Sequence, residues 1–503
     1  MKRTWALISL VLVTLACSLS APTPVAWSGT PTAEARNATS TAFAATRAVE
    51  LTAMPTLPST KTPTPVGMTP TAIPDASAGG PWLIIPAHDG ASLKAYDLAL
   101  GTLTRLDIPP LVNLNDLKDG LSGDGKVLLL RAGSIENLNE LALYKVTNPN
   151  EAVEKVTPLL SIYLQRQIIN QVGKRPARAM NTVVEDGGIA WSPNNNQVAF
   201  TAALDADSGD LYLLDLEKDK LERLTAKYAQ DLSPTWSPGG DWIVFEEAET
   251  QLENGEWRFT SVSAFRIPRF DETRFLYLPP SASVGEKFLG WANAISFLSY
   301  TCTTETCQNL RQVDLESIGV KSIYYGYFSE ASYAAKSRAI ALVVDQKAAN
   351  MDGKSAGVYF SAYEGAPFTQ IMAGDFSNLH WSEAGGMFLV TGKMGVMGIT
   401  PERTSITMQN EVGAEFSPNG AWMVGWNADP VNPGIRLYSA NGNFLQTIST
   451  DGVRYVTWQA DSKGLFMVTN SGIYHVKFPE LKPSLVTDDV YQGDELELVW
   501  LNP

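Results

Sequence analysis

The sequence predicts an all-β protein: a single β-propeller, in which four-stranded sheets, or blades, form a closed ring. Three observations lead to this prediction. A short phrase recurs along the chain, each copy is followed by strand-forming runs, and the last residues repeat only the opening of the phrase. The clearest copies are "AWSPNNNQVAF" from Ala190 and "TWSPGGDWIVF" from Thr235. A single sheet of this size cannot cover both of its faces, so the repeats must stack, and radial stacking makes a propeller.

Each part of the phrase has a structural reason. The tryptophan ends a strand and packs against the neighbouring repeat, and Pro193 or Pro238 stops that strand because proline lacks an N–H donor. The pairs "NN" and "GG" permit a tight turn. "QVAF" and "WIVF" then form a second strand, and "LYLLDL" from Leu211 and "LERLT" from Leu221 form a third and a fourth.

The blade count follows from the copies of the phrase. Nine are found, or eight if one of the weaker copies at Leu121 and Tyr333 is not counted, and seven is a further alternative. The chain ends on "LELVWLNP", residues 496–503, so we expect this strand to complete the blade begun by residues 81–108. The blade residues that we expect to be structural are Trp191, Pro193, Trp236, Pro238, Trp291, Trp381, Pro418, Trp458 and Trp500.

This grammar resembles the TolB-type (WD40-like) propeller repeat. The match is close from Trp191 to Pro193, from Val198 to Phe200, at Leu211, Tyr212 and Asp215, and from Arg223 to Thr225, and it returns from Trp236 to Pro238 and from Ile243 to Phe245. The resemblance covers most of residues 81–503 but is strong in about three repeats. It implies a periplasmic protein-interaction part of the cell envelope. The same repeat builds the propeller of prolyl-oligopeptidase-type peptidases, where an α/β-hydrolase domain is attached.

The N-terminal sequence predicts an export signal. Lys2 and Arg3 precede an apolar stretch that ends in "VTLAC", which resembles the lipobox of bacterial lipoproteins and implies lipid attachment at Cys17. An ordinary signal peptide with an incidental cysteine is the alternative. Residues 18–80 are rich in Pro, Thr and Ala and predict a disordered tether, followed by the propeller at 81–503. We therefore expect a chain anchored to the bilayer by its acylated N-terminus, outside the cytoplasmic membrane.

Composition and motifs argue against several functions. The net charge of −15 without a basic block argues against nucleic acid as a partner. Three separated histidines give no paired metal motif, and we expect no cofactor. No G-x-S-x-G elbow occurs, "GLSGDG" from Gly120 lacks its spacing, and no segment remains for a hydrolase domain. We expect a monomeric ring that is not an enzyme.

Three local features are candidate sites. Cys302 and Cys307 in "TCTTETC" are expected to form a disulfide, with a free thiol pair as the alternative. Asp205, Asp207 and Asp210 in "DADSGD" have spacing that could suit calcium, but a hairpin turn explains the same residues better. An insertion at about 158–182 shows helical spacing of Leu164, Ile168, Ile169 and Val172, and its cations are Arg166, Lys174, Arg175 and Arg178.

The insertion has two interpretations. In one, a helix packs its apolar side on the ring and leaves its charges in solvent. In the other, it is a protrusion that binds a partner, on the face that also carries the long "EEAETQLENGEWRF" connection from Glu246. The second interpretation predicts an interaction or scaffolding module that binds an envelope protein or a cell-wall component. Binding of a glycan or small molecule in the central funnel is the alternative, and a hydrolase is a weaker one.

Overall fold

The structure is a computed structural model that describes residues 79–503, except 173, 227–228, 252–256, 268–284, 304–305, 430 and 494–495. The chain divides into a unit of residues Met1–Ile73 and a unit of residues Pro74–Pro503, and every described residue belongs to the second. The predictions for the signal segment, for Cys17 and for nearly all of the tether lie outside the described residues. In the part that is described, no helix is long and apolar enough to cross a membrane.

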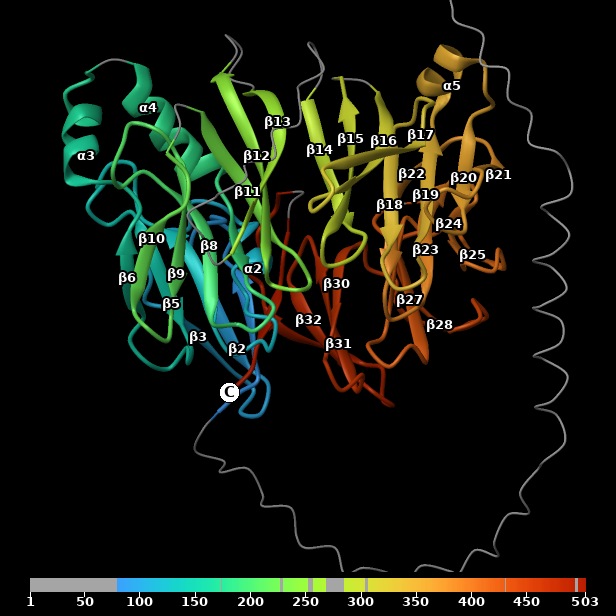
Figure 1. Ribbon diagram of the computed structural model, residues 1–503. Helices are drawn as coiled ribbons and strands as arrows, with labels where there is room; N and C mark the ends of the chain where they lie inside the picture. The colour runs from blue at the N-terminus through green and yellow to red at the C-terminus, as the bar shows by residue number, and fades with distance from the viewer. Residues whose placement is uncertain are drawn as a thin grey trace, which may run out of the picture. The chain divides into compact units, whose positions relative to one another are not determined.

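Residues 82–501 form nine antiparallel sheets arranged as a ring (Figure 1). The prediction of an all-β propeller is confirmed, and of the counts considered nine is right and the alternatives of eight and seven are wrong. Within the described residues, seven sheets have four strands and two have three. Within each blade, strands that follow one another in the chain pair as antiparallel hairpins, and in the first blade β34 is added beside β1.

The first four blades follow one another in the chain, and their strands run from the innermost to the outermost. They are β34 (Val499–Leu501), β1 (Trp82–Pro86), β2 (Leu93–Asp97) and β3 (Thr102–Arg105); β4 (Leu128–Ala132), β5 (Ala142–Val146) and β6 (Glu154–Pro158); β7 (Ile189–Trp191), β8 (Gln197–Ala202), β9 (Asp210–Asp215) and β10 (Lys220–Arg223); β11 (Gln230–Trp236), β12 (Trp242–Gln251) and β13 (Trp257–Arg266).

The remaining five blades each have four described strands. They are β14 (Gly285–Trp291), β15 (Ser296–Cys302), β16 (Cys307–Asp314) and β17 (Gly319–Tyr324); β18 (Glu330–Ala334), β19 (Ala339–Val344), β20 (Gly357–Ser361) and β21 (Thr369–Ala373); β22 (Phe376–Ser382), β23 (Met387–Gly392), β24 (Gly395–Ile399) and β25 (Ser405–Gln409); β26 (Gly413–Phe416), β27 (Trp422–Asn427), β28 (Gly434–Ser439) and β29 (Phe444–Ser449); β30 (Val453–Trp458), β31 (Gly464–Thr469), β32 (Ile473–Lys477) and β33 (Pro483–Thr487).

The C-terminal strand closes the ring as predicted. β34 pairs antiparallel with β1, with Leu83 opposite Trp500 and Trp82 opposite Leu501. Leu501 is fully buried, and the backbone N–H of Asn502 donates to Gly125 O of the second blade at 2.7 Å. The last strand therefore joins the two ends of the folded unit.

Three tryptophans of the repeated phrase donate hydrogen bonds to a neighbouring blade, whereas the indole N–H of Trp381 donates to Glu383 two residues away. The indole N–H of Trp191 donates to Gly120 O at 2.7 Å, that of Trp236 to Ala190 O at 3.0 Å, and that of Trp500 to Trp458 O at 2.7 Å. In each case the acceptor is a backbone carbonyl on the innermost segment of the preceding blade. The prediction that this residue packs against the neighbouring repeat is confirmed.

The serine and the turn residues of the phrase shape the first hairpin. Ser192 Oγ accepts from the N–H of Gln197 at 3.0 Å, and Ser417 Oγ accepts from the N–H of Trp422 at the same distance. In the turn that precedes β12, Gly240 adopts a positive φ of 77°, a conformation in which glycine is favoured because it lacks Cβ. The phrase therefore encodes a capped turn as well as two strands.

Apolar residues between adjacent sheets form the core. In one layer, Ala199, Leu211 and Leu213 of the third blade pack with Ile243 and Phe245 of the fourth. The inward residues of β8, β9 and β12 are buried because the next blade covers each sheet, which explains why these strands read as nearly continuous apolar runs.

The weak copy of the phrase at Leu121 forms something other than a strand. Leu121 makes only an isolated bridge to Leu128, and a short helix α2 (Asp116–Asp119) occupies the inner position before it. The insertion also differs from a single helix: it holds α3 (Ile162–Ile169), α4 (Lys174–Asn181) and a π-helical turn η2 (Thr182–Asp186).

We expect the hydrogen bonds that the tryptophans make between blades to contribute measurably to the free energy of unfolding. Trp236→Phe keeps most of the apolar contact but leaves the carbonyl of Ala190 without its indole donor, so the free energy of unfolding should fall by about 1–2 kcal/mol. Denaturant unfolding measures the change. Trp422→Phe on exposed strand surface is the control and should change stability by less than about 0.5 kcal/mol. Equal effects of the two substitutions would contradict the role assigned to the indole.

Candidate functional site

The long connections of the ring gather on one of its two faces. The segment with α3 and α4 joins β6 to β7, and helix α5 (Gln346–Asp352) joins β19 to β20. The ten-residue strands β12 and β13 extend beyond their neighbours on the same side (Figure 1). We call this the insertion face. The repeated Trp-Ser-Pro turns and the C-terminus lie on the opposite face, so the added helices that the structure describes here share one side of the ring.

Helices α3 and α4 are fixed firmly to the third and fourth blades. Ser161 caps α3, since its Oγ accepts from the N–H of Leu164 at 3.1 Å, and its own N–H donates to Ala203 O at 2.9 Å. Leu164 and Ala179 are buried in the core between the second and third blades. Thr182 Oγ1 donates to Gln230 Oε1 of β11 at 2.9 Å. The inner side of the helix pair is therefore packed against, and hydrogen-bonded to, the sheets beneath it.

The outer side of the helix pair is unusually apolar. The exposed fractions are 67% for Ile162, 70% for Tyr163, 71% for Ile169 and 54% for Val172. The interpretation in which the apolar side packs on the ring holds for Leu164 and, in part, for Ile168, but not for Ile169 and Val172. Exposed apolar clusters of this kind are typical of binding surfaces.

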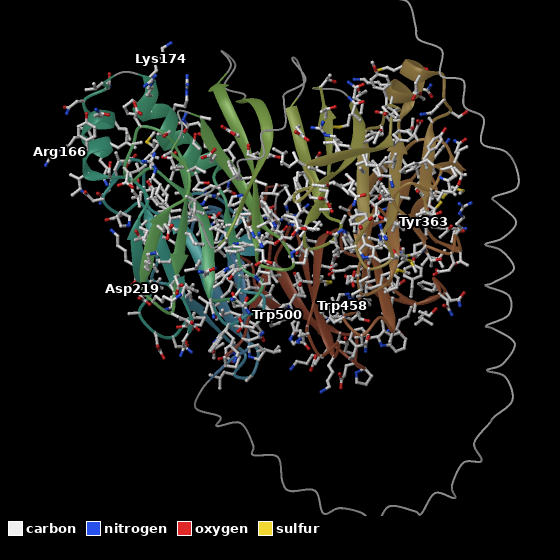
Figure 2. The ribbon with its side chains drawn as sticks, viewed as in Figure 1. Arg166, Lys174, Asp219, Tyr363, Trp458 and Trp500 are labelled. Atoms are coloured by element: carbon white, nitrogen blue, oxygen red, sulfur yellow. A yellow bond between two sulfur atoms is a disulfide. The ribbon has the colours of Figure 1, made fainter. Side chains whose placement is uncertain are left out.

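The four predicted cations lie around this apolar group. Arg166, Lys174 and Arg175 are exposed and Arg178 is half-buried. Arg166 and Lys174 project away from the ring at the corner that holds the two helices, far from Asp219 on the opposite face (Figure 2). Arg175 lies 3.8 Å from the carboxylate of Asp207, a loose contact between exposed groups. The insertion thus combines apolar and positively charged side chains.

The three aspartates considered for calcium serve the β8–β9 hairpin. The buried Asp210 accepts from Arg223 Nη2 at 2.7 Å, and Asp205 accepts from the hydroxyl of Tyr212 at 3.3 Å. Asp207 faces Arg175 instead. Among the residues that the structure describes, no group of three or more His, Cys, Asp or Glu side chains is arranged to hold a metal ion. The turn interpretation therefore accounts for this segment.

Cys302 and Cys307 face each other across the turn between β15 and β16. They are paired residues of the two strands and are joined by a disulfide. The bond closes a hairpin whose tip lies on the insertion face, and the short loop that it spans makes it a local staple.

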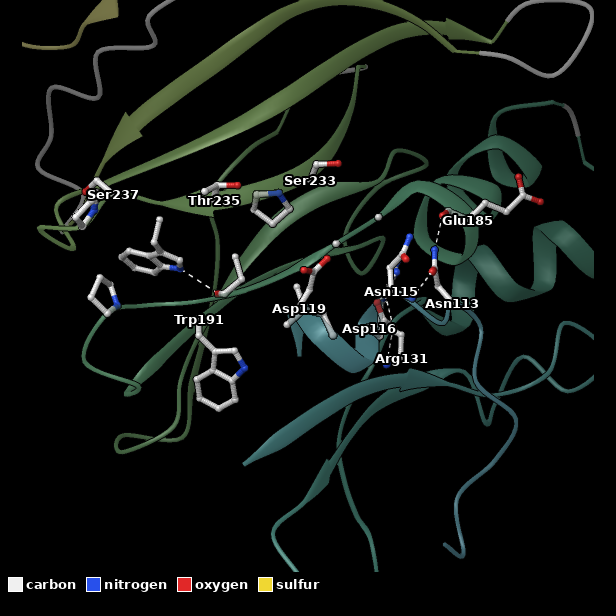
Figure 3. A pocket seen from close by; sticks show the side chains of 18 residues that line it. Asn113, Asn115, Asp116, Asp119, Arg131, Glu185, Trp191, Ser233, Thr235 and Ser237 are labelled. Atoms are coloured by element: carbon white, nitrogen blue, oxygen red, sulfur yellow. Dashed lines mark hydrogen bonds and ion pairs between the residues drawn. The ribbon is translucent and has the colours of Figure 1, made fainter. Parts of the chain in front are cut away.

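A cavity of about 570 Å³ lies beside α2, between the inner strands β7 and β11 (Figure 3). Its wall contains the ion pair of Asp116 and Arg131, in which each side chain is only 1% exposed. Arg131 donates to both carboxylate oxygens of Asp116, and its Nη1 donates to Val183 O at 2.6 Å. The guanidinium thus connects α2 to the base of the insertion, and its hydrogen bonds within the protein give it a structural role.

A larger cavity of about 960 Å³ is lined by β22, β26, β30 and the segment before β34. Aromatic and acidic side chains meet here: Trp381, Glu415, Tyr455 and Glu497 all line it. The hydroxyl of Tyr455 donates to Glu497 Oε2 at 3.4 Å. Burial and, to a lesser extent, the nearby Glu497 carboxylate together raise the pKa of Glu415 to about 8. A carboxyl group that is largely neutral at pH 7 can donate a hydrogen bond.

This shift predicts a pH dependence of stability. The folded protein holds the Glu415 proton up to about pH 8, whereas the unfolded chain releases it near its ordinary pKa of 4.5. The free energy of unfolding should therefore fall as the pH rises from about 5 through 8. Glu415→Gln should remove this slope, so that the variant gains on the parent at about pH 9, as denaturant unfolding at several pH values would show.

Glu383→Gln is the matched control, because the contacts of Glu383 with Lys336 and Trp381 lower the pKa of its carboxylate. That carboxylate is ionised throughout the range from pH 5 to 9, so its replacement should leave the slope unchanged. A parent slope that survives in Glu415→Gln would contradict the assignment.

The sequence prediction does not include Glu415 and Tyr455 as site residues, although the sequence held a signal for Glu415. In most copies of the phrase the residue before the aromatic is small or neutral, as at Ala190 and Thr235. Glu415 is the charged exception, in "EFSP". No comparable signal marks the Asp116–Arg131 pair, because its partners come from a helix and a strand 15 residues apart.

Comparison with known proteins adds no sequence family. No family model matches the chain, and no curated protein matches its sequence. Solved structures do resemble it. An oligogalacturonate lyase in complex with manganese is similar at 13% identity and a TM-score of 0.34, over 62% of this chain and 88% of that one.

Two further structures illustrate the range of similar rings. TolB from Acinetobacter baumannii is 15% identical with a TM-score of 0.29, over 70% of this chain and 74% of TolB. Dipeptidyl peptidase 4 from Porphyromonas gingivalis is 15% identical with a TM-score of 0.46, over 75% of this chain and 60% of the peptidase. The architecture of this chain is established by its own strand pairing, which makes it a nine-bladed β-propeller.

Proposed function

We propose that this chain is a lipid-anchored binding module of the cell envelope, outside the cytoplasmic membrane, which engages a protein partner through its insertion face. The lipobox-like "VTLAC" supports the anchor, with Cys17 as the acylated residue. The Pro/Thr-rich stretch up to residue 80 supplies a semi-rigid tether between anchor and ring. The ring acts as a scaffold and not as a catalyst.

One observation carries the proposal: a firmly packed helix pair on the insertion face exposes four large apolar side chains. Soluble surfaces expose single apolar residues routinely, but a group on one short segment marks an interaction site. Because the inner side of α3 and α4 is buried and hydrogen-bonded, the exposed side is held ready for a partner. Little conformational entropy is then lost when the partner binds.

Affinity capture from solubilised envelopes tests the proposal, with residues 74–503 as bait. This unit contains every described strand and its own ring closure. A second bait carries the substitutions Ile162→Ser, Tyr163→Ser, Ile169→Ser and Val172→Ser. We expect a protein that the first bait enriches and the second loses by at least about tenfold.

A third bait controls for surface changes in general. It carries Lys218→Ser, Asp219→Ser and Lys220→Ser in the β9–β10 turn of the opposite face, and it should enrich the same protein as the parent. Circular dichroism must show that all three baits are folded. If the four serine substitutions on the helix pair leave the enriched proteins unchanged, the proposed contact surface is wrong.

The cavity that contains Glu415 supports a second candidate function, binding of a glycan or small molecule. Its lining joins the flat rings of Trp381 and Tyr455 to the carboxyl groups of Glu415 and Glu497, and such walls suit hydroxylated or amine-bearing ligands. A glycan array probed with the ring and with Glu415→Gln tests it. Signals that the variant loses would favour this candidate, and signals that it keeps would count against it.

A further inference from the structure

The helix pair also indicates the chemistry of its partner. We infer that the α3–α4 surface, made of Ile162, Tyr163, Arg166, Ile169, Val172 and Lys174, docks an acidic segment of a protein that carries apolar anchor residues. This inference rests on the proposed function and goes beyond it, because it specifies what the partner must present.

The arrangement of side chains on α3 sets the pattern of the contact. Ile162, Arg166 and Ile169 are four and three residues apart and so form one stripe on the outer side of the helix. Ile162 and Ile169 lie about 10 Å apart along the axis, with the cation between them. A complementary segment would place two apolar side chains on the isoleucines and a carboxylate on Arg166.

The charge of this region is opposite to that of the chain as a whole. Between Glu154 and Glu185 the sequence has no acidic residue and five cations, namely Lys155, Arg166, Lys174, Arg175 and Arg178, whereas the whole chain has a net charge of −15. A positively charged apolar surface on an acidic protein favours an acidic partner and repels a basic one.

A protein segment fits this surface better than an anionic bilayer does. Asp207 lies beside Arg175, and Glu154 and Glu185 bound the basic stretch, so the surface is small and has acidic neighbours. An extended anionic plane would meet those carboxylates and the acidic ring around them. A segment of a few turns would cover the apolar stripe and its cations only.

The experiment uses the ring of residues 74–503 and three probes. The first is a synthetic helical peptide with leucines on one side and glutamates on the other, the second has lysines in place of the glutamates, and the third is a vesicle of phosphatidylcholine and phosphatidylglycerol. Fluorescence anisotropy measures peptide binding, and flotation measures vesicle binding. We expect the acidic peptide to bind at least about tenfold more tightly than the basic one.

Two variants locate the contact, and one serves as control. Ile162→Ser with Ile169→Ser, and separately Arg166→Ser with Lys174→Ser, should each weaken binding of the acidic peptide about fivefold or more. Ile318→Ser with Val320→Ser removes two similarly exposed apolar side chains from another blade and should leave the affinity unchanged. All of these positions are on the surface, so the variants should fold like the parent.

Each other result overturns the inference. Equal binding of acidic and basic peptides would exclude charge recognition. If the ring bound vesicles more tightly than the acidic peptide, and the same two variants lost vesicle binding, the surface would be assigned to lipid. Self-association that these variants abolish would assign it to a second copy of the chain. Envelope capture lost with the apolar substitutions but kept with Arg166→Ser and Lys174→Ser would refute the acidic partner while leaving the binding module intact.

Discussion

Replacing Arg131 with methionine should lower the free energy of unfolding by about 3–5 kcal/mol, one of the two largest effects that we expect in this ring. The substitution leaves the Asp116 carboxylate buried without its counter-ion, and it frees the carbonyl of Val183 from a 2.6 Å hydrogen bond. Burial already raises the pKa of Asp116 against the pull of Arg131. Denaturant unfolding at neutral pH measures the loss.

Two further variants show whether burial causes the effect. Lys145→Met breaks an ion pair with Glu154 that is far more exposed, and it should cost less than about 1 kcal/mol. Arg131→Met combined with Asp116→Leu removes both buried charges and should be more stable than Arg131→Met alone. The explanation would be contradicted if the double variant lost as much stability as Arg131→Met and Asp116→Leu lose together when each is measured alone.

Removing residues 496–503 should abolish cooperative unfolding of the ring. The truncation deletes β34, so β1 loses its inner neighbour and the contacts of Trp500 and Asn502 to the ninth and second blades disappear. Thermal unfolding followed by circular dichroism, together with limited proteolysis, measures the change. We expect a broad transition and rapid cleavage, since β1 is left with an unpaired inner edge and the contacts that close the ring are lost.

A point substitution in the same strand gives the scale. Leu501→Ala keeps the strand but removes a fully buried side chain, so it should cost about 2–5 kcal/mol while the transition stays sharp. If the truncated chain melts as sharply as the parent, ring closure by β34 is not what holds the blades together.

Local repetition explains why so much of the fold could be predicted. Trp191 and Trp236 recur with the same turn chemistry, and both donate to the preceding blade. Prediction from the sequence failed where contacts with distant residues determine the local structure. The weaker copy at Leu121 keeps the turn and the second strand, yet α2 takes the place of its inner strand, and Asp116 of α2 is held by Arg131.

The candidate site could be located but not characterised from sequence. Helical spacing and the excess of cations identified the insertion, and both features are present in α3 and α4. Periodicity cannot tell how much of an apolar stripe the neighbouring blade will cover, however. Leu164 enters the core whereas Ile169 stays 71% exposed, and this difference depends on the shape of the third blade.

Hydrogen–deuterium exchange of the tagged ring, incubated with and without solubilised envelope extract and then recovered, tests the central claim most directly. We expect slower exchange in α3 and α4 after incubation with extract, and unchanged exchange in the Trp-Ser-Pro turns of the opposite face. Protection confined to β22, β26 and β30, with none in the helix pair, would contradict binding at the insertion face and would place the binding site at the Glu415 cavity.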